Sequence, residues 1–396
     1  MSPFQSKLTC PFCFHQFNLD DSKYRCINSR CSKREADTIY GTARGLAAAP
    51  IMGHIFERKN EGWRQRAFAS DKGQKCDACS QLSNKRVCPT CHFELSHDVG
   101  QLSEYIIAII GGRNTGKGHY IATLIQRLES EIGRQFKFSL RMLGDDTRQR
   151  FEDDYYTPLF RKKGIIQPTV SAVVDSQVKL PMVFRLTFGD GKKLRALNLS
   201  FFDSAGEDME SLDTMSTEAR YICYASGIVF LLDPLQIDAV RERLPEEYLP
   251  PRYPHAEPQY IIERLRELFE RQFKLPATTK IKVPVAFVLS KVDTLFPLID
   301  PSSALFMTGE HFGHFNLTDS QSVHTEIWNY LQAWSGAGIS NRVETSFENF
   351  HYFGVSSLGR MPDKSGKLET ISPIRVEDPF LWILYQLDLV KGQKER

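Results

Sequence analysis

The stretch GGRNTGKG, residues Gly111–Gly118, decides the fold of this chain because of the segments on either side of it. An apolar run from Tyr105 to Ile110 precedes it and predicts a buried parallel strand. Apolar residues at helical spacing follow it, at Ile121, Leu124, Ile125, Leu128 and Ile132. A strand, a glycine-rich loop that ends in Gly-Lys and a helix together form the setting that a phosphate-binding loop requires.

The chemistry of this loop favours a bound phosphate. Its glycines let backbone N–H groups wrap around the phosphate, the helix N-terminus attracts negative charge, and Lys117 adds a cation over the β- and γ-phosphates. Lys117 therefore also counts among the expected catalytic residues. The residues that we expect to bind nucleotide here are Gly111, Arg113, Asn114, Thr115, Gly116, Lys117, Gly118 and His119.

A second phosphate-binding segment follows the apolar run Leu197–Phe202. Asp203 ends that run, and a carboxylate at the end of a strand can take part in the ligand shell of Mg²⁺. Gly206 lies three residues further on and can donate its N–H to a γ-phosphate. Both residues are therefore expected at the nucleotide.

Two later segments point to guanine as the base. Asp293 follows the strand-like run Val283–Leu289 and can accept two hydrogen bonds from a guanine edge, while the stem of Lys291 packs over the base. A last segment follows the run Phe350–Val355. The expected base-binding residues are Ser290, Lys291, Asp293, Ser356, Ser357 and Leu358. All of these segments follow apolar strands, at the carboxyl ends where open α/β sheets bind ligands.

In this order the segments resemble the motifs of Ras-like GTPases of the translation-factor-related class. Gly111–Gly118 resembles their P-loop, Asp203–Gly206 their DxxG motif, and Ser290–Asp293 their Asn/Thr-Lys-x-Asp motif with serine in first place. Ser356–Leu358 is similar to their weakly defined last motif. The resemblance covers about residues 103–395 and implies GTP or GDP with Mg²⁺ as cofactors. The motif spacings are longer than in minimal small GTPases, so it also implies insertions.

Three positions bear on hydrolysis. Gly118 stands where the P-loop pattern has Ser or Thr, whose hydroxyl normally binds Mg²⁺. Glu207 stands where many relatives carry Gln to orient the attacking water, and a carboxylate there repels the γ-phosphate. Thr169 is the expected threonine of the first switch, with Thr157 or a plain loop threonine as alternatives. Thr115 and His119 are the first alternatives for the ligand that Gly118 lacks. The expected catalytic set is Lys117, Thr169 and Glu207.

Eight of the nine cysteines lie before residue 92, in pairs that are typical of a metal framework in a reducing compartment. Two turns of the CxxC type complete a tetrahedron of thiolates around one ion. We expect two structural Zn²⁺ ions, at Cys10/Cys13/Cys26/Cys31 and at Cys76/Cys79/Cys88/Cys91. His15 and His92 follow CxxC turns and are alternative metal ligands, but four cysteines already complete each site, so both are expected at the surface. Residues 32–75 form either a linker or part of one composite double ribbon.

The cysteine-rich front end adds a further resemblance, to bacterial zinc-ribbon GTPases encoded beside multi-protein conflict or defence systems. That resemblance implies one or more protein partners. Net charge is +2 and names no partner. Residues 1–100 hold 15 Lys and Arg against 10 Asp and Glu, which keeps nucleic acid as an alternative partner of the zinc ribbons. No apolar run approaches the ~18 residues of a membrane span, and no signal-peptide core is found. The expected location is cytoplasmic.

Together these features predict an N-terminal double zinc-ribbon region, residues 1–98, and a P-loop GTPase-like domain, residues 99–396, with a doubly wound, mostly parallel α/β sheet. The expected function is a GTP-binding switch with slow or partner-stimulated hydrolysis, whose zinc ribbons dock a protein. The alternatives are a scaffold that lost nucleotide chemistry or nucleotide altogether, an ATPase, and a zinc-ribbon nucleic-acid binder.

Overall fold

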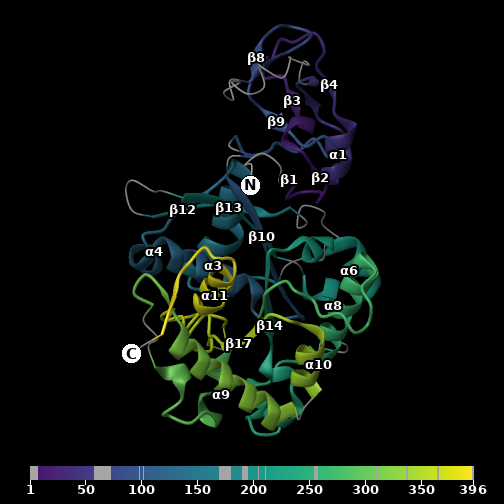
Figure 1. Cartoon of the computed structure of the whole chain (residues 1–396). Coiled ribbons are helices and arrows are strands. Elements are labelled where there is room, and N and C mark those ends of the chain that lie inside the picture. The colour runs from purple at the N-terminus through teal and green to yellow at the C-terminus, as the bar shows by residue number, and fades with distance from the viewer. Residues whose placement is uncertain are drawn as a thin grey trace. The chain divides into compact units, whose positions relative to one another are not determined.

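A computed structural model describes residues 8–57, 73–97, 99–100, 102–168, 180–189, 195–203, 205–209, 211–253, 257–307, 311–335, 338–363 and 365–394. The chain forms two compact units, Met1–Glu104 and Tyr105–Arg396 (Figure 1). This division falls a few residues after the expected boundary at residue 98.

The second unit is built on a seven-stranded sheet with the order β11-β12-β13-β10-β14-β15-β17. The strands are β10 (Ser103–Gly111), β11 (Ser139–Met142), β12 (Met182–Phe188), β13 (Arg195–Asp203), β14 (Gly227–Leu232), β15 (Val285–Leu289) and β17 (Phe350–Gly354). β10, β14, β15 and β17 pair in parallel, whereas β11, β12 and β13 pair antiparallel. The sheet is therefore parallel from β10 to β17 and antiparallel from β11 to β13.

Helices cover both faces of this sheet. α3 (Lys117–Glu129) and α11 (Asp378–Gln386) share one hydrophobic core with residues of β10, β14 and β15. Figure 1 shows α6 (Leu212–Glu218), α8 (Pro258–Phe273) and α10 (Gly338–Ser346) on the other side of the strands. Every residue of β14 and β15 is buried, as expected for strands with helices on both faces. Further α-helices among the described residues of this unit are α4 (Glu131–Phe136), α5 (Asp145–Arg150), α7 (Asp238–Arg241) and α9 (Leu317–Ser335).

The chain departs from the expected elements after α3. The helical pattern that includes Ile132 is divided between α3 and α4, because the backbone at Ser130 (φ −112°, ψ −101°) is not helical. The segment that follows α5 is a π-helix, Phe151–Arg161, with Pro158 inside it. Pro158 has no N–H to donate to the helical ladder, and wider turns are often found where that ladder is interrupted.

The parallel strands place their carboxyl ends at one edge of the sheet. Gly111 at the end of β10 pairs with Leu231 in β14, and Leu232 pairs with Leu289 at the end of β15. Leu289 in turn pairs with Gly354 at the end of β17. The expected binding segments follow these ends, so the topology gathers them. Among the described residues, no helix has the length and apolar character needed to span a membrane.

The described part of the first unit contains an α-helix and short strands. They are α1 (Thr38–Arg44), β1 (Leu8–Thr9), β2 (Gln16–Phe17), β3 (Lys23–Arg25), β4 (Glu35–Ala36), β5 (Ile51–Met52), β6 (Ile55–Phe56), β7 (Gln74–Lys75), β8 (Leu82–Ser83) and β9 (Arg86–Val87). One of its hydrophobic clusters consists of Tyr24 and Phe56 with cysteine side chains. Thiols thus occupy positions that larger apolar residues fill in an ordinary core.

Candidate nucleotide site and metal centres

The glycine-rich loop joins β10 to α3 and is tied together by its own side chains. Lys117, the first residue of α3, is buried, and its Nζ donates to the carbonyl oxygens of Gly111 and Gly112, each at 3.0 Å. The hydroxyl of Thr115 donates to the same Gly112 carbonyl at 3.1 Å. Gly116 has φ 87°, a left-handed conformation that glycine adopts without strain. The lysine therefore lies over the loop that would cradle a phosphate.

Asp203 lies beside the first turn of α3. It is the last residue of β13, a neighbour of β10 in the sheet, and its side chain is buried. Its Oδ2 accepts a hydrogen bond from the hydroxyl of Tyr155 at 2.9 Å. A Cβ placed on Gly118 would lie 3.9 Å from the same oxygen. The carboxylate expected near Mg²⁺ and the glycine that lacks a hydroxyl thus face each other.

Gly206 lies directly against the glycine-rich loop. A Cβ at this position would lie 2.3 Å from the backbone nitrogen of Arg113 and 2.4 Å from the carbonyl carbon of Gly112. No larger residue fits without a shift of one backbone segment. The expected γ-phosphate sensor therefore touches the expected phosphate loop.

The expected base-binding residues also meet. The Ser356 hydroxyl donates to Asp293 Oδ1 at 2.5 Å, and the same hydroxyl oxygen accepts from the Gly359 N–H at 2.8 Å. Burial raises the pKa of Asp293, although the Ser356 hydrogen bond acts in the opposite direction. Ser290 is buried, and its hydroxyl donates to the Leu232 carbonyl at 3.0 Å. Ser357 and Leu358 are half-buried beside Ser356.

Lys291, in the expected base-binding segment, forms an ion pair with a residue of the neighbouring strand end. Its backbone is left-handed (φ 54°), and its Nζ forms a 2.8 Å ion pair with Asp233, which follows β14.

His119 in α3 accepts the backbone N–H of Ile166 on Nε2 at 3.0 Å. Burial, and then the charge of Lys291, lowers the pKa of His119 to about 4. His119 is therefore a neutral imidazole that fixes Ile166 to α3.

Comparison with known proteins gives the family. Residues 105–358 match the model of the family described as Double-GTPase 2. The chain belongs to the Double-GTPase 2 family. It is also 30% identical over 317 residues to a protein of Mycolicibacterium smegmatis named "Putative ESX-1 scaffolding and assembly protein SaeC". That match covers 75% of this chain and 78% of the relative.

One contact of the Double-GTPase 2 domain was not expected from the sequence. Tyr253, in the proline-rich insertion between α7 and α8, accepts a hydrogen bond from the Asn114 side-chain amide at 3.0 Å. The Arg113 guanidinium carbon lies 6.0 Å from the centre of the Tyr253 ring. This proline-rich segment thus contacts the glycine-rich loop.

Several expected residues are placed elsewhere or lie outside the described residues. Thr169, the expected threonine of the first switch, lies outside them, and so does the side chain of Glu207. Thr157 lies within the π-helix, where its hydroxyl donates to Glu152 at 3.2 Å. The roles of Thr169 and Glu207 stay predictions.

The eight early cysteines form two clusters of four, but the expected grouping is wrong. One cluster is Cys10, Cys13, Cys88 and Cys91, and the other is Cys26, Cys31, Cys76 and Cys79. The first and last pairs along the chain thus enclose the two middle pairs. Spacing within a pair does not encode which distant pair completes the set. Residues 32–57 and 73–75 therefore belong to one composite module.

The sulfur positions fit zinc. Within each cluster all four Sγ atoms lie within 4.8 Å of one another. The Cys10–Cys91, Cys13–Cys88 and Cys26–Cys79 sulfur pairs are 3.7, 3.6 and 3.5 Å apart. A tetrahedral Zn²⁺ with bonds of about 2.3 Å to sulfur places its ligands roughly 3.8 Å apart. Both clusters thus have the number, type and spacing of ligands of a closed structural site.

Three of the four cysteine pairs share one backbone turn. In each, the first cysteine donates its N–H to the carbonyl five residues later, as Cys10 does to His15 at 3.0 Å. The N–H of the fourth following residue returns to the carbonyl of that cysteine. This residue is left-handed in every case, at Phe14, Ser80 and His92 with φ near 60°. Cys26 and Cys31, with four residues between them, lack this turn.

His92 is a correction to the expected surface position. His15 is exposed as expected, but His92 is buried and its Nδ1 lies 2.9 Å from Asp37 Oδ1. Arg25 donates to Asp37 Oδ2 at 2.9 Å and to the His92 carbonyl at 3.0 Å. Asp37 also caps α1 by accepting the Tyr40 N–H. This buried network joins β3 and α1 to the last cysteine pair.

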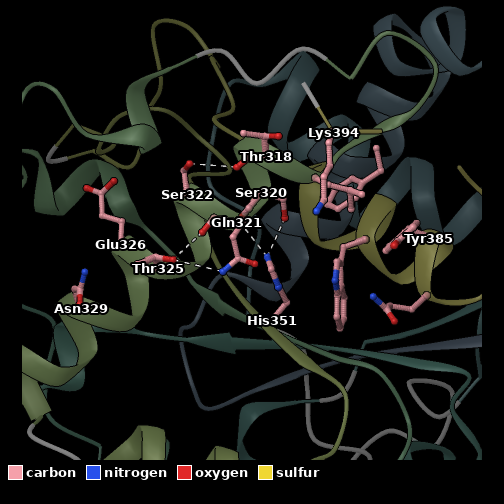
Figure 2. Close-up of a pocket in the computed structure, with 14 residues that line it drawn as sticks. Thr318, Ser320, Gln321, Ser322, Thr325, Glu326, Asn329, His351, Tyr385 and Lys394 are labelled. Atoms are coloured by element: carbon pink, nitrogen blue, oxygen red, sulfur yellow. Dashed lines mark hydrogen bonds between the residues drawn. The ribbon is translucent and has the colours of Figure 1, made fainter. Parts of the chain in front are cut away.

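A separate cavity of about 830 Å³ lies between α9, β17 and α11 (Figure 2). There His351 Nε2 lies 2.9 Å from the Ser320 hydroxyl and 3.1 Å from the Ser320 carbonyl oxygen. Burial, and then the neighbouring His324, lowers the pKa of His351 to about 3. A base this weak does not activate a serine at neutral pH. The contact between His351 and Ser320 therefore holds α9 against β17. None of the residues that line this cavity belongs to the expected nucleotide site.

Proposed function

We propose that this chain is a GTP-binding scaffold protein: its Double-GTPase 2 domain binds GTP and GDP, and its zinc module docks a protein partner. The proposal rests on the hydrogen bond between Ser356 and Asp293. These two residues lie at the carboxyl ends of the parallel strands, where Lys117, Asp203 and Gly206 also lie. Base recognition and phosphate recognition are thereby available at one site.

The base assignment rests on hydrogen-bonding capacity. The Ser356 hydroxyl occupies one position on Asp293 Oδ1, which leaves acceptor capacity on the carboxylate for the two N–H groups of guanine. Adenine offers no such pair of donors on its corresponding edge. The aliphatic stem of Lys291, with its ammonium held by Asp233, provides an apolar surface for the ring.

The phosphate end fits Mg²⁺ in part. Asp203 supplies a carboxylate, and Mg²⁺ commonly takes one or two carboxylates together with substrate phosphates and water. When bound, the ion would neutralise charge that develops on the phosphates. Gly118 supplies no oxygen, and Glu207 adds a negative charge to the same segment. We therefore expect slow hydrolysis that a partner accelerates, with Lys117 and Thr169 as the residues on the phosphates.

The zinc module is the proposed docking element. Its two clusters are closed by four cysteines each, so they are built to hold structure and not to open a coordination site. The relative named for ESX-1 scaffolding and assembly supports protein partners. No observation on the described residues favours nucleic acid. Eight thiols reserved for metal suit a reducing compartment, which supports a cytoplasmic location.

The test is a titration of the purified full-length chain with fluorescently labelled GTP, GDP and ATP, with and without Mg²⁺. We expect GTP and GDP to bind and unlabelled ATP to compete at least tenfold more weakly. Equal competition by ATP would remove the guanine assignment. Absence of binding by all three nucleotides would leave the nucleotide-free scaffold as the function of the fold.

A further inference from the structure

The first turn of α3 lacks the hydroxyl of the P-loop pattern, but a hydroxyl from another segment lies close by. Gly118 has no side chain, and a Cβ built there would lie 3.9 Å from Asp203 Oδ2 and 3.7 Å from Cε1 of Tyr155. The Tyr155 hydroxyl donates to that same Oδ2 at 2.9 Å. The phenol therefore stands beside the carboxylate, next to the position to which a serine at residue 118 would point.

Packing fixes Tyr155 in this position. Its side chain is 3% exposed, and its ring stacks on Phe151, with ring centres 6.0 Å apart. Phe151 in turn meets Phe184 of β12 edge to face. Phe151 and Tyr155 both belong to the core that α3 and the sheet share. The phenol is thus held between the sheet and α3 by residues that are themselves buried.

The proton on the phenol is also fixed. A phenol O–H donates and a carboxylate oxygen accepts, and these two groups lie 2.9 Å apart. The hydroxyl is therefore a donor and Asp203 the acceptor. A donated hydrogen bond on Oδ2 fixes the rotation of the carboxylate about its own axis, and second-layer hydrogen bonds of this kind orient metal-binding carboxylates.

We infer that Tyr155 is the positioning residue of the metal site. Its hydroxyl orients the Asp203 carboxylate toward nucleotide-bound Mg²⁺ and so compensates for the hydroxyl that is missing at Gly118. The inference rests on the proposed function and deepens it, because it names how the site binds metal with a glycine at this position. Tyr155 does not touch the nucleotide. It acts through Asp203.

The experiment compares the parent, Tyr155→Phe and the control Tyr156→Phe. Tyr156 is the adjacent residue on the same segment, and its ring packs on Phe160. The affinity for a fluorescent GTP analogue is measured over a series of Mg²⁺ concentrations and in EDTA. Outer-layer substitutions commonly weaken metal binding by about 10- to 100-fold, so we expect the Mg²⁺ midpoint of Tyr155→Phe to rise by about that factor. Affinity in EDTA should stay unchanged, and Tyr156→Phe should match the parent.

A second variant separates positioning from a general structural role. The double variant Gly118→Ser with Tyr155→Phe returns a hydroxyl to the first turn of α3. We expect its Mg²⁺ midpoint to fall at least part of the way back to that of the parent. Thermal unfolding verifies that the variants are folded. A midpoint in Tyr155→Phe that is unchanged or lower than in the parent overturns the inference and leaves GTP binding intact. Equal loss of affinity in EDTA and in Mg²⁺ also overturns it. If the parent binds no guanine nucleotide at all, the proposed function itself has failed.

Discussion

Asp293 is a half-buried carboxylate that accepts a hydrogen bond from the Ser356 hydroxyl. Burial of a carboxylate is costly unless hydrogen bonds satisfy it, and the donors of a guanine base would do so. The side chain is thus arranged so that the bound base completes its hydrogen bonding.

Replacement of Asp293 is expected to remove guanine selectivity. A pair of charge-assisted hydrogen bonds contributes about 2–3 kcal/mol, so Asp293→Ala should weaken GTP binding roughly 30- to 150-fold. Asp293→Asn presents N–H donors in place of an acceptor, and we expect it to favour xanthosine triphosphate, whose ring carries a carbonyl at that edge. Competition titrations measure both effects.

The matched control is Asp388→Asn. Asp388 is exposed, follows α11 and has a left-handed backbone (φ 57°) that asparagine adopts readily. It should leave GTP affinity unchanged. Equal loss of affinity in Asp293→Asn and Asp388→Asn would mean that Asp293 does not contact the base.

Gly118→Ser is expected to tighten Mg²⁺-dependent GTP binding. The new Cβ would lie 3.1 Å from the Ile166 Cγ2 methyl, a distance that a small shift of this side chain relieves, and the hydroxyl would lie near Asp203. The measured quantity is the ratio of GTP affinities with and without Mg²⁺. Gly338→Ser at the start of α10 is the control, because a Cβ there would meet only the Arg342 guanidinium, at 3.7 Å. A ratio that falls in Gly118→Ser would show that the added side chain obstructs the metal.

At the scale of elements, the strands were the most predictable part of the chain. β10 and β13 contain the expected runs Tyr105–Ile110 and Leu197–Phe202, because continuous apolar runs mark buried strands directly. β11 begins only at Ser139 although Phe136 and Phe138 are also apolar, since Phe136 ends α4 and Lys137 takes a left-handed helix cap. An apolar residue between two elements can belong to either, and only packing decides.

The partners of each cysteine pair follow from long-range topology, and the nested grouping can be tested by metal content. Cys10→Ser with Cys91→Ser removes two ligands of one cluster, so elemental analysis should still find about one zinc per chain. Cys10→Ser with Cys26→Ser removes one ligand from each cluster and should leave close to none. The parent should hold about two. The reverse pattern in the two double variants would support the sequential grouping.

At the scale of the whole molecule, a buried charge network joins α11 to the segment before α9. Asp378 accepts from Arg375 at 2.9 Å and from His311 Nε2 at 2.9 Å, and His311 Nδ1 accepts the Asn316 N–H. Burial alone would raise the pKa of Asp378, but hydrogen bonds and charges from His311 and Arg375 lower it overall. Asp378 therefore contributes stability above its unfolded pKa of ~3.9, and this contribution is lost as pH falls through the lower folded value.

Asp378→Asn should destabilise the second unit at neutral pH. Breaking a buried charge pair costs about 3–5 kcal/mol, and the difference from the parent should shrink as pH falls below ~4. Three of the four tryptophans, Trp328, Trp334 and Trp382, lie in this unit, so tryptophan fluorescence during denaturant unfolding reports mainly on it. Asp388→Asn is again the exposed control. A difference that is independent of pH would show that lost packing, not charge, is responsible.

The candidate site was predictable from sequence only where a motif places a residue directly after a strand. Lys117, Asp203 and Asp293 lie where such motifs place them, because parallel topology gathers strand ends. Tyr155 and Tyr253 reach the site from segments that carry no motif, the π-helix and the segment between α7 and α8. The sequence did not indicate which carboxylate the Tyr155 phenol would meet. The expected link to conflict or defence systems stays a prediction.

The nested order of the cysteine pairs also sets a sequence of events during translation. The inner cluster is complete as soon as Cys79 has left the ribosome, whereas the outer cluster must wait for Cys91 although its first two ligands are the earliest of all. Metal capture would then proceed from the inside outward.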